Sequence, residues 1–278
     1  MIRLIALDLD GTTLQSDSTL SANTKQVLEE ATSKGVHVVA ASGRSFHALP
    51  DCLREIRGME YAIGSNGASI HRLSDSRRIY DDLLEPGMVM EFLWQIEAYP
   101  ELALEAFVEG IPYTEQAFLE APERYGMQGR VKEYLKMSRR PVDNIHHFLT
   151  EFKDRVDAMA VIVGDMDLKL RIREQLNAMD GFRITSSFVN MLEIVSPTAG
   201  KGAAVAWLAN RLGIGPEQVM ACGNADNDLD MICYAGVGVA VDNSPEELKM
   251  AADYVTADND HEGVALAIRK FVLEGDNG

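Results

Sequence analysis

The stretch MIRLIALDLDGTTL, residues 1–14, joins a short aliphatic run to two aspartates and a glycine. The run Ile2–Leu7 predicts a buried strand, since fully buried strands of a parallel sheet are continuous runs of such side chains. Asp8 and Asp10 come at its end, and because side chains alternate along a strand, they share one face. Gly11 then allows a sharp exit. The stretch therefore predicts a strand that delivers two carboxylates to the carboxyl edge of a sheet.

The alternation of aliphatic runs with amphipathic segments continues to about residue 83. We expect a helix from Ser21 to Lys34 and a second buried strand over Val36–Ala41. A helix to about Glu55 and a strand over 61–64 should follow. Strands that alternate with helices are typical of a parallel sheet with crossover connections.

The same rhythm returns at Pro197 and continues to the last residues of the chain. The expected elements alternate again: a helix at 202–212, a strand at 219–222, a helix at 226–234, a strand at 237–241, a helix from 245, a strand at 254–256 and a helix from 263. The two stretches together predict an α/β fold with a Rossmann-like, parallel-sheet core.

The segment between them has a different pattern. It predicts a helix over 85–99, extended chain over 102–114, a strand over 158–163, a helix over 165–179 and a hairpin made of 182–187 and 191–195. More antiparallel pairing indicates an α+β insert. We therefore expect a core domain made of residues 1–83 and 189–278, interrupted by an inserted domain of residues 84–188.

The composition excludes several classes of protein. The chain has 278 residues, of which 46% are hydrophobic, and a formal net charge of −17. Such acidity disfavours binding to nucleic acid or an anionic membrane, and an anionic substrate would need a local positive centre. No apolar window is long enough to span a bilayer. Three cysteines without metal-ligand spacing favour free thiols in the cytoplasm.

Chemistry-bearing residues follow the strands of the predicted core. In open parallel sheets, ligands bind beyond the carboxyl ends of the strands. Asp8 and Asp10 follow the first strand, the run Ser42-Gly43-Arg44 follows the second, and GNADND at 223–228 follows the strand at 219–222. Lys201 precedes the helix that leads to this last strand. These segments should converge on one edge of the sheet.

Two neighbouring carboxylates favour a cation between them or a proton on one of them. Oxygen ligands are those that Mg²⁺ prefers, and Mg²⁺ commonly bridges carboxylates and phosphate. A carboxylate can attack phosphorus to give an aspartyl phosphate, and a second one can act as general acid and base. Taken singly, DLDG is also typical of a strand and turn, and NADND of a helix start. Their order and their placement after strands favour a phosphotransfer site.

In combination, DLDGT at 8–12, SGR at 42–44, Lys201 with Gly202, and GNADND at 223–228 resemble the four motifs of the haloacid dehalogenase-like phosphatases. The mixed insert resembles the α+β (C2B-type) cap of the Cof-type, or IIB, subfamily, as do SNGA at 65–68 and the tail from residue 242. The resemblance covers essentially the whole chain. It implies a Mg²⁺-dependent phosphatase whose cap closes over the site and selects the leaving group.

The resemblance also implies roles for single residues. Asp8 would be the nucleophile, Asp10 the general acid and base, and Lys201 the cation that neutralises the nucleophile and the phosphate. The expected substrate-binding residues are Ser42, Gly43, Arg44, Lys201 and Asn227. Mg²⁺ would be bound by Asp8, the Asp10 carbonyl and the fourth motif through Asn224 and Asp228.

One residue departs from the family's pattern, which has GDxxND in the fourth motif. Here Asn224 follows Gly223, so an amide stands where an acid is usual. Either the site functions with weaker Mg²⁺ affinity or with help from Asp226, or the protein binds phosphorylated ligands without turnover. A phosphomutase of the same superfamily is a further alternative. A dinucleotide-binding enzyme is disfavoured, because no G-x-G-x-x-G follows the first strand.

The expected substrate is a small phosphorylated metabolite: a sugar phosphate, a nucleotide or flavin phosphate, or pyridoxal phosphate. Nothing in the sequence selects among these. We expect the protein to be a monomer or a weak homodimer.

Overall fold

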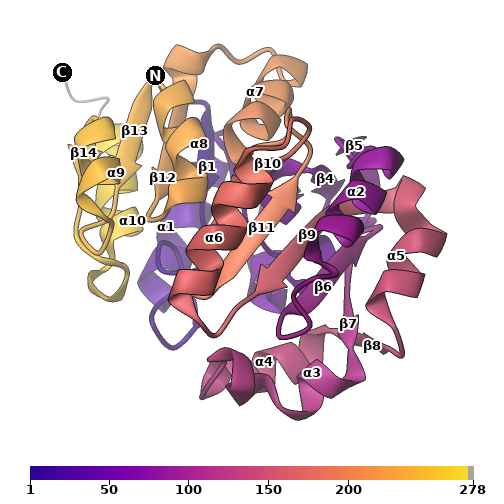
Figure 1. The fold of residues 1–278 in the computed structure, drawn as a ribbon. Helices are drawn as coiled ribbons and strands as arrows, with labels where there is room; N and C mark the ends of the chain where they lie inside the picture. The colour runs from indigo at the N-terminus through magenta and orange to yellow at the C-terminus, as the bar shows by residue number, and fades with distance from the viewer. Residues whose placement is uncertain (275–278) are drawn as a thin grey trace. The chain divides into compact units, whose positions relative to one another are not determined.

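The computed structural model describes residues 1–274. The chain divides into two compact units, and we describe each by itself (Figure 1). Within the described residues, the first unit consists of Met1–Gly43, Leu49–Tyr80 and 200–274. The second consists of Arg44–Ala48 and Asp81–Ala199.

The first unit is built on an eight-stranded sheet in the order β14-β13-β12-β1-β2-β3-β4-β5. The strands are β1 (Leu4–Leu7), β2 (His37–Ala41), β3 (Tyr61–Gly64), β4 (Ser69–Arg72), β5 (Arg78–Asp81), β12 (Val219–Gly223), β13 (Val237–Ala240) and β14 (Tyr254–Val255). Every neighbouring pair from β14 to β3 is parallel, and β4 returns antiparallel to β3. The predicted α/β class with a parallel-rich core is confirmed.

The central strand β1 determines where the site lies. It pairs with β12 and β2 in parallel, and Leu7 stands opposite both Cys222 and Ala40. The residues that follow these three positions therefore leave the sheet at the same edge. All four residues of β1 are buried, as expected for the middle of a parallel sheet.

The α-helices of the first unit are α1 (Ala22–Ser33), α7 (Lys201–Arg211), α8 (Leu229–Tyr234), α9 (Glu246–Ala251) and α10 (Gly263–Ile268). The side chain of Ser21 caps α1 by accepting a hydrogen bond from the amide of Thr24 at 3.0 Å. On one face of the sheet, Leu4 and Ala6 pack in a single core with Val205 of α7 and Met231 of α8.

The helix expected up to about Glu55 does not form. In its place are two short 3₁₀ turns, η1 (Phe46–Ala48) and η2 (Asp51–Glu55). Pro50 lies between them with extended backbone. A proline lacks the amide hydrogen that a continuous helix needs at this point. The expected helix over 226–234 likewise begins with a 3₁₀ turn, η7 (Asp226–Asp228), before α8.

The second unit has its own six-stranded sheet, in the order β10-β11-β9-β6-β7-β8. Its strands are β6 (Ala103–Val108), β7 (Ile111–Glu115), β8 (Arg140–Val142), β9 (Val156–Ile162), β10 (Arg183–Thr185) and β11 (Met191–Val195). The pairs are antiparallel except β7 with β8. The expected α+β pattern of the insert, including the β10–β11 hairpin, agrees with this sheet.

The helices of the second unit are α2 (Pro86–Ile96), α3 (Gln116–Glu120), α4 (Arg130–Ser138), α5 (Ile145–Phe152) and α6 (Met166–Asn177). The sheet has an apolar core on each face. Met159 and Val161 of β9 pack with Phe92 and Ile172 from α2 and α6. The residues of β9 that alternate with Met159 and Val161 lie on the other face, where they belong to a separate apolar cluster with residues of α3 and α4.

The end of the insert lies further along the chain than the expected residue 188. Strand β11 stands between β9 and β10, with Leu192 opposite Val161, and so it is an inner strand of the second sheet. The second unit accordingly extends to Ala199. A five-residue strand that is mainly apolar has the same pattern in either sheet, so the sequence of β11 does not indicate to which sheet it belongs.

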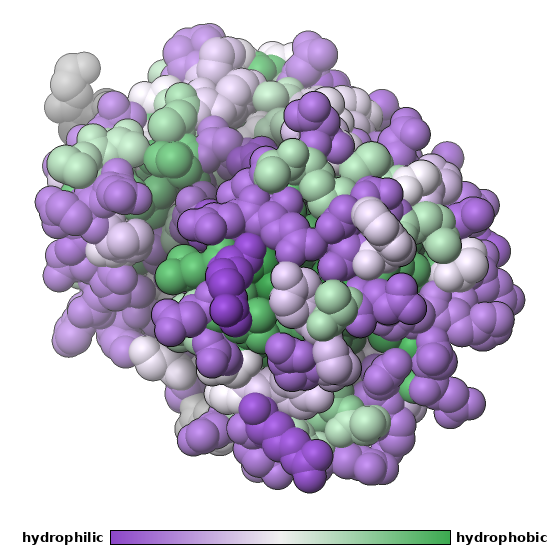
Figure 2. Space-filling model, viewed as in Figure 1, coloured by the Kyte–Doolittle hydropathy of each residue, from purple (hydrophilic) through white to green (hydrophobic). Residues whose placement is uncertain are grey.

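The face drawn in Figure 2 is largely hydrophilic, with apolar side chains in small groups. Among residues 1–274, no helix has the length and apolarity that crossing a membrane would require.

Candidate active site

A buried ion cluster lies where β1 and β12 end. The amide of Asp8 donates to the carbonyl oxygen of Cys222 at 3.0 Å, which extends the pairing of the two strands by one step. Lys201, the first residue of α7, donates from Nζ to Asp8 Oδ1 at 2.7 Å and to Asp228 Oδ1 at 2.6 Å. The exposed fractions of Asp8, Lys201 and Asp228 are 5%, 1% and 0%. One cation thus links the first and fourth motifs.

The surroundings change the acidity of this cluster. Burial raises the pKa of Asp8 to about 7, and the charge of Asp228 adds to this effect, while Lys201 opposes it. Burial alone would lower the pKa of Lys201, but the charges of Asp228 and Asp8 outweigh burial and raise it above its ordinary value. Lys201 is therefore a permanent cation, and it is the local positive centre that an anionic substrate needs in this acidic chain.

Both carboxylate oxygens of Asp228 accept hydrogen bonds from other residues of the chain. Its Oδ1 accepts from Lys201, and its Oδ2 accepts from the amides of Asn224 and Ala225 at 2.9 and 3.0 Å. A carboxylate has about four acceptor positions, and three are used here. Asp228 therefore holds Lys201 and the loop that carries Asn224, and one of its acceptor positions is left for the metal ion that the sequence assigns to it.

The side chain of Asn224 points at the expected metal ligands. The end of its carboxamide that faces Asp8 lies 3.1 Å from Asp8 Oδ2, 3.1 Å from Thr12 Oγ1 and 3.2 Å from the Asp10 carbonyl oxygen. With nitrogen at that end, the amide donates to these three oxygens. With oxygen at that end, it accepts from Thr12. A Cβ on Gly11, whose φ is +77°, would collide with this carboxamide, so the approach requires a glycine.

These positions fit Mg²⁺. The ion binds oxygens octahedrally at about 2.0–2.1 Å, so adjacent ligands lie about 3 Å apart. The Asn224 carboxamide lies at this distance from both Asp8 Oδ2 and the Asp10 carbonyl oxygen. Among residues 1–274, no group of three or more His, Cys, Asp and Glu side chains forms a metal site. The fit therefore depends on one carboxylate, one backbone carbonyl and one amide.

Asp10 lies beside this group. Its backbone forms an isolated bridge with Leu14, which fixes the loop after β1. Its charge contributes to the raised pKa of Asp8, so the two carboxyl groups are close enough to interact. The hydroxyl of Thr13 donates to the Asp8 carbonyl at 2.6 Å and braces the same loop.

The second motif begins where β2 ends. The amide of Ser42 donates to the Ile63 carbonyl at 3.0 Å, and the Ser42 carbonyl accepts from the amide of Asn66 at 3.1 Å. Ser42 is buried, and Gly43 follows it as the last residue of its segment in the first unit. The second motif is thus hydrogen-bonded to the segment that follows β3.

Asn227, an expected substrate-binding residue, is buried and donates from Nδ2 to Asn66 Oδ1 at 2.8 Å. In the sequence, Asn66 stands out only as part of SNGA at 65–68, one of the stretches that resemble the Cof-type subfamily. Its position after β3, the next strand beyond β2, is the signal that would have placed it at the same edge.

Arg44 belongs to the second unit. Its guanidinium lies 4.4 Å from the ring centroid of Tyr134, and Nη1 donates to the Ala48 carbonyl at 3.4 Å. Arg139 stacks on the same ring at 4.9 Å and pairs with the buried Glu105. Tyr134 is thus flanked by two guanidinium groups, and Arg44 is the expected site residue that the structure associates with the second unit.

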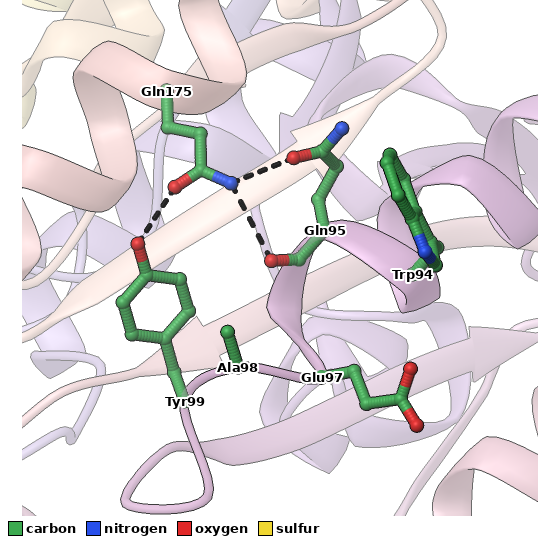
Figure 3. Close-up of a pocket in the computed structure, with 6 residues that line it drawn as sticks. All are labelled: Trp94, Gln95, Glu97, Ala98, Tyr99 and Gln175. Atoms are coloured by element: carbon green, nitrogen blue, oxygen red, sulfur yellow. Dashed lines mark hydrogen bonds between the residues drawn. The ribbon is translucent and has the colours of Figure 1, made fainter.

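A hollow of about 460 Å³ opens at the end of α2 (Figure 3). Gln175 joins its sides by donating to Gln95 Oε1 at 2.7 Å and accepting from the Tyr99 hydroxyl at 2.8 Å. Trp94 and Glu97 complete the lining with Ala98. No cationic side chain lines it, so it does not suit a phosphate group.

Comparison with known proteins identifies the family. A sequence model of the haloacid dehalogenase-like hydrolases matches residues 5–268, so the chain belongs to this family of enzymes. Over 276 residues it is 28% identical to a 5-amino-6-(5-phospho-D-ribitylamino)uracil phosphatase of Bacillus subtilis, and the match covers 98% of this chain and 96% of that protein.

Solved structures agree with this assignment. A haloacid dehalogenase-like hydrolase from B. subtilis is 26% identical, with a TM-score of 0.84 over 98% of this chain and 100% of that one. A sugar phosphatase of subclass IIB of the same superfamily has a TM-score of 0.78 at 22% identity, over 97% of this chain and 98% of that one. At that identity the likeness concerns the fold.

Proposed function

We propose that this protein is a Mg²⁺-dependent phosphatase that hydrolyses phosphate monoesters of small metabolites through an aspartyl phosphate on Asp8. The observation that carries the proposal is the buried cluster of Asp8, Lys201 and Asp228 at the carboxyl ends of β1 and β12. It combines a nucleophilic carboxylate with a fixed cation, at an edge where the Asp10 carbonyl and Asn224 offer further oxygens.

The reaction would proceed in two transfers. A carboxylate oxygen of Asp8 attacks phosphorus, the bond to the ester oxygen breaks, and Asp10 gives that oxygen a proton. Asp10 then takes a proton from water, whose oxygen attacks phosphorus and releases Asp8 and inorganic phosphate. Lys201 offsets the negative charge that gathers around Asp8 in both transfers. Ser42 and Gly43 would hold phosphoryl oxygens.

Bound Mg²⁺ would supply positive charge next to the transferred phosphoryl group. Asp8, the Asp10 carbonyl and Asn224 would hold it, with Asp228 fixing the Asn224 loop. When Asp10 is ionised and no substrate is bound, the formal charges balance, since Asp8, Asp10 and Asp228 give three negatives and Mg²⁺ with Lys201 gives three positives. This balance and the spacing of the oxygens favour an active enzyme over a silent binding protein, despite Asn224.

The substrate class is a small phosphorylated metabolite, and the name of the B. subtilis relative puts 5-amino-6-(5-phospho-D-ribitylamino)uracil in the group to be tried. Sugar phosphates, nucleotide and flavin phosphates, and pyridoxal phosphate complete it. We place the enzyme in the cytoplasm, where its three free cysteines would stay reduced.

The test is a screen of these esters with Mg²⁺ for release of inorganic phosphate, comparing the wild type with Asp8→Asn. We expect Mg²⁺-dependent turnover of at least one ester by the wild type and none by Asp8→Asn. Equal turnover by the two proteins would remove Asp8 as the nucleophile. Absence of turnover by the wild type on every ester, with turnover by Asn224→Asp, would establish a silent relative instead.

A further inference from the structure

The turn after β3 has an unusual backbone. Ser65, Asn66 and Gly67 form the 3₁₀ turn η3, and their φ angles are +50°, +53° and +94°. Left-handed backbone is unfavourable for residues other than glycine and is seldom found at successive positions. Such conformations persist only where the surroundings enforce them, and they concentrate at functional sites.

The turn touches three of the four motif segments. The amide of Asn66 donates to the Ser42 carbonyl, and Asn66 Oδ1 accepts from Asn227 Nδ2 at 2.8 Å. On its other side, a Cβ added to Gly67 would collide with the Gly200 carbonyl, directly before Lys201. Asn66 therefore stands among the groups proposed to hold the phosphoryl group.

One polar group of Asn66 has no hydrogen-bond partner among the described residues. The residue is 1% exposed, and its Nδ2 has no hydrogen-bond acceptor among residues 1–274. Because Asn227 donates to the oxygen end of the carboxamide, the nitrogen end is the one left without an acceptor. Buried N–H groups are nearly always satisfied, so an orphan at a site requires an explanation. Ser42 and Lys201 are equally buried, so the burial of Asn66 does not argue against its belonging to the site.

We propose that Asn66 is a further substrate-binding residue, whose Nδ2 donates a hydrogen bond to an oxygen of the phosphoryl group. This inference rests on the proposed phosphatase function and adds to it a donor from a segment outside the four motifs. The oxygens of a phosphoryl group accept hydrogen bonds, and one of them would satisfy the Nδ2 of Asn66. The left-handed turn then serves to present the amide between Ser42 and Asn227.

Two variants separate this role from simple bracing of Asn227. Asn66→Asp keeps an acceptor for Asn227 and a residue that tolerates left-handed backbone, but removes the N–H. Asn66→Gly removes the whole side chain, adds no charge and suits the same backbone. The measurements are kcat and KM on the best ester from the screen and, as a readout independent of turnover, binding of orthovanadate by calorimetry in Mg²⁺.

We expect both variants to bind orthovanadate at least about tenfold more weakly than the wild type, at temperatures where all three are folded. Wild-type binding by both variants would overturn the proposal. Loss of orthovanadate binding in Asn66→Gly alone would mean that Asn66 only braces Asn227. Loss of binding in Asn66→Asp alone would mean that the added negative charge causes it. If the wild type lacks turnover, the proposed function fails, while the orthovanadate comparison still decides the role of Asn66.

Discussion

Asn224 replaces the acid that is usual in the fourth motif, and its position gives this exchange a measurable consequence. In the metal-free chain its amide nitrogen can donate to Asp8 Oδ2 and the Asp10 carbonyl. Asn224→Asp would replace that donor by a negative oxygen facing two acceptors. We predict that the metal-free free energy of unfolding falls by about 1–3 kcal/mol, while the Mg²⁺ association constant rises by roughly tenfold, equivalent to about 1.4 kcal/mol.

Thermal unfolding with and without Mg²⁺, together with calorimetric titration of the ion, checks this prediction. Gln26→Glu is the matched control, because it adds the same charge on the exposed surface of α1. It should change neither quantity by more than a few tenths of a kcal/mol. An unchanged Mg²⁺ affinity in Asn224→Asp would mean that residue 224 does not face the ion.

Asp8 should make metal binding depend on pH. Its pKa is raised to about 7 in the metal-free fold, chiefly by burial and then by Asp228. The folded chain therefore holds this proton more tightly than the unfolded chain does. The resulting stabilisation is complete below about pH 4 and is lost as the pH rises through about 7. Because Mg²⁺ requires the ionised carboxylate, we predict that its affinity rises up to about pH 7 and then levels.

Calorimetry in buffers of different ionisation enthalpy measures the proton released when Mg²⁺ binds. We expect close to one proton at pH 6 and little release at pH 8. An affinity that is constant between these values would show that Asp8 is already ionised at pH 6.

The turn η3 supports the start of α7, and a pair of glycines tests this packing. Gly67 and Gly35 both have left-handed backbone, with φ of +94° and +82°. A Cβ on Gly67 would meet the Gly200 backbone, whereas one on Gly35 would meet nothing within 4 Å. We predict that Gly35→Ala costs about 1–2 kcal/mol from backbone strain alone, and that Gly67→Ala costs about 1–3 kcal/mol more from overpacking. Urea unfolding measures both, and equal costs would contradict the packing.

The sequence predicted those elements whose pattern is local. The aliphatic runs of β1, β2 and β12 and the polar residues after them are enough to indicate a parallel sheet and its functional edge. The helical periodicity of the residues around Pro50 conceals the interruption of the helix at this proline. The position of β11 depends on its partners in space rather than on its own residues.

The same distinction holds within the site. Residue types predicted the carboxylates and Lys201. They could not predict that Asp228 uses its oxygens on Lys201 and on the amides of Asn224 and Ala225, because those bonds depend on how the loop folds. The free N–H of Asn66 is likewise visible only when its neighbours are known.

Across the whole chain, the two units differ in how they are assembled. The first is made of three separated segments, which bring distant motifs to one sheet edge. The second is almost one continuous segment, and its sheet has an apolar core on both faces. A continuous segment with a core of its own has what an independently folding domain requires. The proposed catalytic groups thus come together only when the discontinuous first unit folds, whereas the insert does not depend on that unit.

We therefore predict that a fragment of residues 81–199 folds alone, with a cooperative thermal transition followed by circular dichroism and a free energy of unfolding of about 5–15 kcal/mol. It keeps all six strands. Its lost contacts with the segment at 44–48 include the hydrogen bond of the His47 amide to Gly110, that of the Tyr134 hydroxyl to Ala48, and the Arg44 guanidinium on the Tyr134 ring. Each of these hydrogen bonds is worth about 0.5–1.5 kcal/mol.

A fragment of residues 84–188 is the control. It lacks β11, so β9 and β10 lose their shared partner and the sheet is split. This shorter fragment should show no cooperative transition. A cooperative transition of the same midpoint in both fragments would mean that β11 is dispensable and that the second unit ends where the sequence pattern alone placed it.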